Sequence, residues 1–189
     1  ILKKISHSFN IPSEIVIAIW GIETNYGTYT GGFKVLESLS TLAYASKRKN
    51  FFKKEFFNAI KIIDKELISK ELLLGSWAGA MGQSQFMPSS YLNYAYDYSG
   101  DNKTDIWNTE SDIFASISNY LKKHGWIEEE PWCYEINKKE FKAIKDLKLK
   151  KFDFSTILRE NILENQILER YKKPIVGKLK IVGLKNDKR

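Results

Sequence analysis

Residues Ile15–Gly27 read IVIAIWGIETNYG, and our interpretation of the fold starts from this stretch. Its first half is apolar on nearly all sides, which is typical of a helix buried in the middle of a domain. Pro12 suits the first position of such a helix, and Gly27 suits its end. One carboxylate, Glu23, comes just before the polar turn. We therefore expect a buried helix that carries a single acidic side chain near its end.

Glu23 is the first candidate for chemistry. A carboxylate at the end of an apolar helix is unfavourable unless it is paired, exposed in a cleft or kept partly neutral. A partly neutral carboxyl group is what a general acid requires. The alternative is a glutamate that only reaches solvent where the helix leaves the core. This stretch by itself leaves both interpretations open.

The composition limits the class of protein. A chain of 189 residues with 43% hydrophobic and 14% aromatic residues is long enough for one cored domain with at most a small appendage. Its longest apolar run is far too short to span a membrane. The single cysteine, Cys133, excludes an internal disulfide and a cysteine-based zinc site. His7 and His124 are too isolated for a metal site or a catalytic triad, so we interpret both as surface residues.

The net charge of +7 is unevenly distributed. Residues 1–130 hold 14 Lys and Arg against 15 Asp and Glu, whereas residues 131–189 hold 16 against 8. We therefore expect a nearly neutral main domain, 1–130, and a basic appendage, 131–189. The appendage could contact an anionic polymer or an acidic lipid surface, or could simply be a solvated surface. No reading motif accompanies the charge, so we expect no nucleic-acid partner.

The chain starts at Ile1 without a signal-peptide pattern, so we expect a piece of a longer protein.

Apolar residues at helical spacing predict a mainly α-helical main domain. Besides the Glu23 helix, the expected helices span 1–9, 35–45, 51–67, 89–96 and 111–124. A Gly/Thr loop is expected at 26–33 and a polar break at 47–50. In the appendage we expect short strands at 132–136, 141–144 and 175–184 and a charged helix at 156–171, which makes it a small α/β unit.

The segment 75–90, GSWAGAMGQSQFMPSS, combines small residues with polar side chains. Glycine and alanine let another backbone or a ligand approach closely. Gln83 and Gln85 offer amide donors and acceptors that suit hydroxyl and acetamido groups. An ordinary tight turn between helices is the alternative.

The segment 97–107, DYSGDNKTDIW, spaces side-chain oxygens as a calcium-binding loop does. Asp97, Ser99 and Asp101 alternate as the first ligands, and Asp112 could close the shell from the next helix. Asn102 stands where the turn glycine is expected, and Asn108 stands where a bidentate glutamate belongs. An Asx-rich turn without metal is the alternative interpretation.

Three sequence blocks, in order, carry a resemblance to a known family. They are GIETNYG at 21–27, GSWAGAMGQSQFMPSSY at 75–91, and DYSGDNKTDIW leading to ISNYLKKHGW at 117–126. Together they resemble the membrane-bound lytic murein transglycosylase B family of peptidoglycan-cleaving enzymes. The resemblance covers roughly Ile5 to Trp126 and implies a lysozyme-like helical fold with a saccharide groove.

The resemblance also implies roles for individual residues. The catalytic acid corresponds to Glu23. The implied substrate-binding residues are Ser76, Met81, Gln85, Phe86 and Tyr120. The implied calcium ligands are Asp97, Ser99, Asp101, the carbonyl of Lys103, and Asp112. No cofactor is implied beyond one structural calcium ion, and a one-residue insertion before Asp112 departs from the family's loop.

The implied reaction needs one carboxyl group, because the substrate supplies the nucleophile. The family cleaves the bond between N-acetylmuramic acid and N-acetylglucosamine and forms a 1,6-anhydro ring. Implied with it are peptidoglycan strands as partner and a periplasmic location with possible attachment to a membrane or the cell wall. The sequence leaves the oligomeric state open, and we expect a monomer. The family's NFY and TRYN blocks, which complete the cleft, are not found after residue 130. Their absence and the basic appendage favour one alternative, a non-catalytic peptidoglycan-binding or scaffold protein. A lysozyme-type hydrolase on the same fold is the other alternative.

Overall fold

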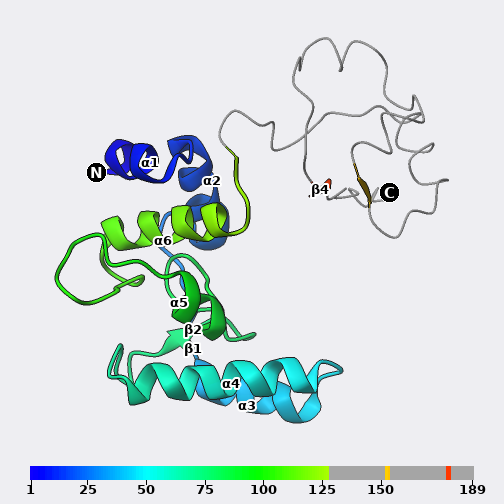
Figure 1. The fold of residues 1–189 in the computed structure, drawn as a ribbon. Coiled ribbons are helices and arrows are strands. Elements are labelled where there is room, and N and C mark those ends of the chain that lie inside the picture. The colour runs from blue at the N-terminus through cyan, green and yellow to red at the C-terminus, as the bar shows by residue number, and fades with distance from the viewer. Residues whose placement is uncertain (128–151, 154–177, 180–189) are drawn as a thin grey trace, which may run out of the picture. The chain divides into compact units, whose positions relative to one another are not determined.

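The computed structural model describes residues 1–127, 152–153 and 178–179 (Figure 1). The chain divides into two units, Ile1–Glu128 and Glu129–Arg189. In the second unit the structure describes β3 (Phe152–Asp153) and β4 (Lys178–Leu179), which pair antiparallel with Phe152 opposite Leu179. β4 falls within the strand expected at 175–184. The elements expected at 132–136, 141–144 and 156–171 lie outside the described residues, and the roles assigned to 1–130 and 131–189 stay predictions.

The first unit is a helical domain with one short antiparallel strand pair. Its elements in chain order are α1 (Leu2–Phe9), α2 (Ser13–Thr24), β1 (Phe33–Lys34), α3 (Val35–Ala45), α4 (Lys49–Asp64), β2 (Leu74–Gly75), α5 (Pro88–Tyr94) and α6 (Glu110–Lys123). These helices confirm the mainly α-helical prediction. In the described residues, no helix is both long and apolar enough to cross a membrane.

The central helix of this domain is α6. It packs against α1, α2 and α5, and Figure 1 shows it between the α1–α2 pair and α5. Every side chain from Asp112 to Ser118 is buried. The polar ones are satisfied: Ser116 Oγ accepts the Tyr96 N–H at 2.9 Å, and Ser118 Oγ donates to the Phe114 carbonyl at 2.7 Å. Hydrogen-bonded polar groups can be buried at little net cost, so α6 can be enclosed despite its serines.

The prediction that α2 is the buried central helix is wrong. Only Val16 and Thr24 of α2 are buried, and Ile22 is 83% exposed. Val16 lies in the core, and the Trp20 ring packs edge-on against Phe114 of α6 with centroids 5.0 Å apart. An all-round apolar sequence indicates that a helix can be buried on any face, but the neighbours that are present decide which face is covered.

The ends of α2 also differ from the prediction. Pro12 is the N-cap residue, one position before the first helical residue. The helix ends at Thr24, three residues before Gly27, and the C-cap residue Asn25 takes the left-handed conformation. Asparagine tolerates this conformation better than most residues and can end a helix. Glu23 therefore lies in the last turn of α2.

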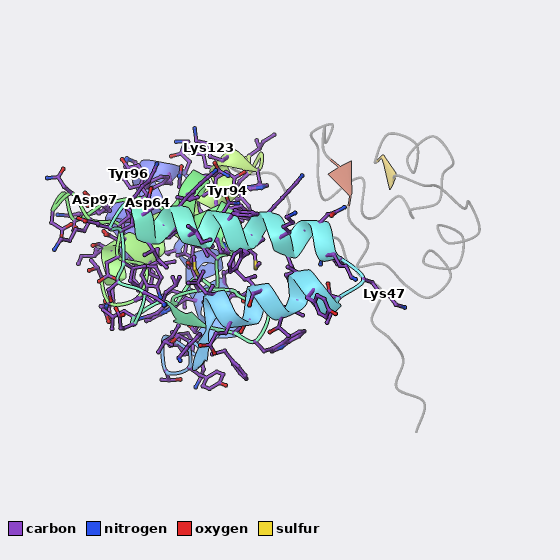
Figure 2. All side chains as sticks on the ribbon, turned by 90° about the horizontal axis from the view of Figure 1, so that it is seen from below. Lys47, Asp64, Tyr94, Tyr96, Asp97 and Lys123 are labelled. Atoms are coloured by element: carbon purple, nitrogen blue, oxygen red, sulfur yellow. The ribbon has the colours of Figure 1, made fainter. Side chains whose placement is uncertain are left out.

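The α3 and α4 helices form a pair that β1, β2 and α5 join to the rest of the domain. Figure 2 shows Lys47 at one end of this pair and Asp64, the last residue of α4, at the other. α4 begins two residues earlier and ends three residues earlier than the sequence predicts. In the strand pair, Phe33 lies opposite Gly75 and Lys34 opposite Leu74.

A buried carboxylate from α4 caps α5. Glu55 is 4% exposed, and its two oxygens accept the Ser89 N–H at 2.8 Å and the Ser89 hydroxyl at 2.7 Å. The first N–H groups of a helix have no partner within the helix, and a carboxylate there also favours the helix dipole. Glu55 thus fixes the start of α5, directly after the glycine-rich segment.

Candidate active site

Glu23 lies in the last turn of α2 and is exposed to solvent as a whole residue. Partial burial of its carboxyl group nevertheless raises the pKa of Glu23 above the ordinary value of 4.5. The carbonyl groups at the end of α2 act in the same direction, because they disfavour a negative charge. The one salt bridge among the described residues joins Lys34 and Glu37, so no cation in that part of the chain lowers the pKa of Glu23. This carboxyl group is accessible, and its raised pKa means that it keeps its proton to a higher pH than a fully solvated glutamate does.

The end of α2 is held by Thr24, the residue after the acid. Thr24 is 2% exposed. Its hydroxyl lies 3.2 Å from both the Trp20 and the Gln83 carbonyl oxygens and accepts the Gly27 N–H at 3.1 Å. These contacts fix the turn that follows Glu23 and join it to the glycine-rich segment.

Gln83 connects three parts of the chain through its side chain. Its Oε1 accepts the Trp20 indole N–H at 2.8 Å, and its Nε2 donates to the Trp107 carbonyl at 2.6 Å. Its backbone N–H donates to the Ile106 carbonyl at 2.8 Å. The sequence suggested that Gln83 could contact sugar, but the structure shows that both ends of its amide are occupied within the protein. Gln83 therefore positions α2 against the glycine-rich segment.

Ser76 and Gln85 each keep one polar group free among the described residues. Ser76 Oγ accepts the Ala80 N–H at 3.0 Å, so its own hydroxyl hydrogen is not used there. Gln85 Nε2 donates to the carbonyls of Thr30 and Gly82, at 3.1 and 2.9 Å, which leaves its Oε1 as an acceptor. A free donor and a free acceptor on neighbouring turns suit the hydroxyl and amide groups of a saccharide.

The structure places Met81 and Phe86 in the core. Met81 is fully buried, and its backbone bridges Gly75 and Phe86. Phe86 is 7% exposed. A side chain with no accessible surface cannot touch a ligand, so the expected substrate contact of Met81 is corrected to a packing role. Phe86 supports Tyr120 instead, with ring centroids 5.5 Å apart.

Tyr120 belongs to an aromatic cluster on α5 and α6. Its ring lies 5.2 Å from that of Tyr94, which is labelled in Figure 2, and 4.0 Å from His124 in a stacked arrangement. His124 Nδ1 lies 2.7 Å from the Tyr120 carbonyl oxygen. His124 and His7 are both exposed, as expected of surface residues. Half-buried Tyr120 thus presents a fixed ring beside the segment that carries Gln85.

Sequence reasoning did not single out Ser84. It is 5% exposed, and its hydroxyl has no hydrogen-bond partner among the described residues. A buried hydroxyl without a partner is unfavourable and is usually satisfied by water or a ligand. Its position between the two candidate residues Gln83 and Gln85 is the sequence feature that could have identified it.

The oxygen-rich loop is organised by Asp112. This residue is fully buried at the start of α6. Its Oδ1 accepts the Tyr98 and Ser99 N–H groups, both at 3.0 Å, and its Oδ2 accepts the Asp105 N–H at 3.1 Å. Three backbone N–H groups therefore already balance the charge of this carboxylate.

The other predicted calcium ligands bond within the loop. Asp97 is half-buried and accepts the N–H groups of Gly100 and Asn102 at 2.7 and 2.9 Å, and the first of these bonds is the main cause of its lowered pKa. Asp101 accepts the Lys103 N–H at 2.9 Å. In the described part of the chain, no three acidic, histidine or cysteine side chains are grouped so as to hold a metal ion. The residues present therefore fit a calcium ion poorly.

The structure brings Glu23, Ser76 and Gln85 into one region through their neighbours. Thr24 bonds to Gln83, and Gln85 bonds to Thr30 in the loop after α2. Gly31 packs against Gly75 and Ser76 so closely that a side chain at Gly31 would meet their backbone. The end of α2, the 26–33 loop and the glycine-rich segment therefore form one continuous surface. The loop at 97–105 supports α6 and adds no group to this surface.

The chain is similar in sequence and fold to known proteins. Residues 1–174 match the family described as transglycosylase SLT domain. The chain is 39% identical over 127 residues to membrane-bound lytic murein transglycosylase B of Escherichia coli, and the match covers 67% of this chain and 35% of that protein. The chain thus spans about a third of that relative's length.

Solved structures agree. SltB3 from Pseudomonas aeruginosa in complex with NAG-NAM-pentapeptide is 36% identical with a TM-score of 0.70, covering 80% of this chain and 41% of that one. The Escherichia coli lytic transglycosylase Slt35 in complex with calcium is 30% identical with a TM-score of 0.67, covering 84% and 50%. These matches confirm the lysozyme-like helical fold predicted from the three sequence blocks. The chain belongs to the transglycosylase SLT domain family.

Proposed function

We propose that this chain is a peptidoglycan lytic transglycosylase in which Glu23 is the single catalytic acid and base. The observation that carries the proposal is the state of Glu23: an accessible carboxyl group with a raised pKa and no cation beside it in the described part of the chain. A general acid that works near neutral pH needs a carboxyl group with a raised pKa. Membership of the family and likeness to a relative solved with NAG-NAM-pentapeptide support the choice of substrate.

In the proposed reaction, protonated Glu23 gives its hydrogen to the glycosidic oxygen between N-acetylmuramic acid and N-acetylglucosamine. The bond from that oxygen to the muramoyl C1 breaks, and the glucosamine end leaves with a hydroxyl group. The 2-acetamido carbonyl stabilises the positive centre at C1. The Glu23 carboxylate then takes the C6 hydroxyl hydrogen as that oxygen bonds to C1. No water is consumed, and Glu23 returns to its protonated form.

The bonding of the carboxylates at 97–112 supports a one-carboxylate mechanism. A hydrolysing glycosidase normally places a second carboxyl group across the bond as base or nucleophile. Asp105 and Asp112 instead accept backbone N–H groups within the protein, and Asp97 does the same in its loop. The substrate's own C6 hydroxyl is therefore the better nucleophile for this site.

The groups that would hold the saccharide are the Gln85 Oε1 acceptor, the Ser76 hydroxyl donor and the half-buried Tyr120 ring. Gln85 and Ser76 would orient amide and hydroxyl groups, and Tyr120 would line the groove. Peptidoglycan strands are thus the proposed partner and a periplasmic location the proposed compartment, with membrane attachment suggested by the name of the relative. We propose no step through a metal ion, because the loop carboxylates are occupied by N–H donors.

The test is the mass of the products from purified peptidoglycan. The chain should release muropeptides with a 1,6-anhydro end, and Glu23→Gln should release none. Glu14→Gln, an exposed acid in the first turn of the same helix, is the matched control and should cleave normally. Products one water heavier would identify a hydrolase. Binding without cleavage, unaffected by Glu23→Gln, would identify a non-catalytic protein.

A further inference from the structure

The turns beside the candidate site expose three aromatic rings that the proposed reaction does not use. Tyr29 is 71% exposed, Phe33 is 53% exposed and Trp77 is 65% exposed. We refer to Tyr29, Phe33 and Trp77 as the aromatic ledge. Large exposed aromatic side chains that gather on neighbouring segments usually mark a binding surface.

The fold holds the segments of the ledge together. Phe33 lies opposite Gly75 in the β1–β2 pair, and Trp77 follows Gly75 by two residues. The β1–β2 pair and the turns beside it belong to the part of the domain between α5 and the α3–α4 pair in Figure 1. Tyr29 comes from the same loop, and its N–H donates to the Thr24 carbonyl at 3.0 Å. Tyr29 is thus bonded to the end of α2, whereas Phe33 belongs to the strand pair and Trp77 directly follows it.

The ledge is continuous with the candidate site. Ser76 stands between Gly75 and Trp77 in the chain, and Gln85 bonds to Thr30, the residue after Tyr29. A side chain built at Gly32 would meet nothing within 4 Å, so the surface beside Phe33 is open. The open space at Gly32 and the chain links through Ser76 and Thr30 thus place the ledge directly beside the candidate site.

We propose that the aromatic ledge is an additional saccharide subsite, which stacks on the sugar rings of the glycan strand beyond the bond that is cleaved. This inference rests on the proposed function, since it extends the same substrate past Ser76. A pyranose ring has one face of C–H groups, which packs on an aromatic ring while the hydroxyls stay in water. Aromatic rings give a large contact area at low entropic cost because they have few rotatable bonds. The occupant is the sugar backbone and not the peptide.

The test measures binding of peptide-free glycan strands to the full chain carrying Glu23→Gln, so that no ligand is consumed. Against this background, the ledge variant combines Phe33→Ser and Trp77→Ser. Tyr44→Ser is the matched control, because Tyr44 is 83% exposed near the far end of α3. Trp77→Phe keeps an aromatic ring and tests whether stacking is what matters. Thermal unfolding of each variant checks that the fold is kept.

We expect the ledge variant to bind long strands about tenfold more weakly and a tetrasaccharide unchanged. Tyr44→Ser and Trp77→Phe should stay within about twofold of the parent. Equal binding of long strands by ledge variant and parent would overturn the proposal. So would an equal loss for short and long strands, or a loss seen only with peptide-bearing strands. If the unsubstituted chain makes no anhydro products but its binding still depends on the ledge, the proposed reaction fails and the subsite stands.

Discussion

The Trp20 indole donates its N–H to the side-chain carbonyl of Gln83 across 2.8 Å, although the two residues are 63 positions apart. The other end of the same amide donates to the Trp107 carbonyl. One side chain thereby joins the acid-bearing helix to the glycine-rich segment and to the turn before α6. The position of Glu23 relative to Ser76 and Gln85 depends on this amide.

Replacing Gln83 should lower both stability and activity. Gln83→Met keeps most of the volume but leaves the Trp20 N–H and the Trp107 carbonyl without their partner. Losing partners of partly buried polar groups costs about 1–3 kcal/mol each. We expect a drop of about 2–4 kcal/mol in the free energy of unfolding, measured by urea denaturation, and a lower kcat.

A double-mutant cycle separates the Trp20–Gln83 bond from general damage. Trp20→Phe removes the indole donor and leaves an aromatic ring beside Phe114. If the bond matters, the combined Trp20→Phe and Gln83→Met variant should lose at least about 0.5 kcal/mol less than the sum of the two single losses. Strict additivity would show that Gln83 acts through its other contacts.

Replacing Glu55 should lower the stability of the domain, because its buried carboxylate caps α5. Glu55→Ala removes both acceptors of Ser89 and leaves the start of α5 uncapped. The expected loss is about 1–3 kcal/mol in the free energy of unfolding, because a buried N–H and a hydroxyl lose their partner. Glu71→Ala, an exposed residue outside the helices, is the control and should change stability little. Equal effects of the two substitutions would contradict the capping role.

The raised pKa of Glu23 should make the folded chain less stable at neutral pH than its Glu23→Gln variant. Below the ordinary value of 4.5, both folded and unfolded states hold the proton, and the two proteins should be alike. As pH rises through 4.5, the unfolded state loses its proton first, so the free energy of unfolding falls until the pH passes the folded pKa. The measurement is the difference in Tm between the two proteins across that range. A variant less stable than the parent at neutral pH would contradict it.

Activity should fall as pH rises through the folded pKa of Glu23. The proposed first step needs the protonated carboxyl group, and its population declines above that pKa. The pH profile of kcat/KM on soluble glycan strands reports this value for the free protein. If kcat/KM does not fall as pH rises through the pKa of Glu23, another group must be the acid.

Calcium should leave the stability of this chain unchanged. Asp112 already accepts three backbone N–H groups, and Asp97 and Asp101 accept others within the loop. Thermal unfolding in excess CaCl₂ and in EDTA should therefore give the same Tm. A higher Tm in calcium, lost in Asp112→Asn, would show that the loop rearranges around an ion.

The sequence predicted the helical architecture well because its helices are amphipathic and end at recognisable residues. The α1, α3 and α6 ranges agree with the structure within about one residue, as expected from periodicity and caps. It misjudged which helix is central. The α2 sequence is the more apolar, but α6 has neighbours on more sides and buries its serines through hydrogen bonds. Periodicity describes one helix at a time and carries no information on such neighbours.

The candidate site was predictable where a local motif carries it and not where distant residues meet. Glu23, Ser76 and Gln85 stand in short blocks that resemble a family, so their positions could be named. The bonding of Gln83 to Trp20 and Trp107 joins residues that no local pattern relates. Met81 shows the opposite error. A residue inside a motif was expected to touch substrate, but the tight turn places its side chain in the core.

A carbon-13 NMR titration of the Glu23 carboxyl group, assigned with the Glu23→Gln variant, tests most directly the claim that this residue can hold a proton for catalysis. The account predicts a midpoint above 4.5, because the carboxyl group is partly desolvated and no described cation stands beside it. A midpoint at or below 4.5 would mean that Glu23 gives up its proton as readily as an ordinary glutamate, and it would contradict the account.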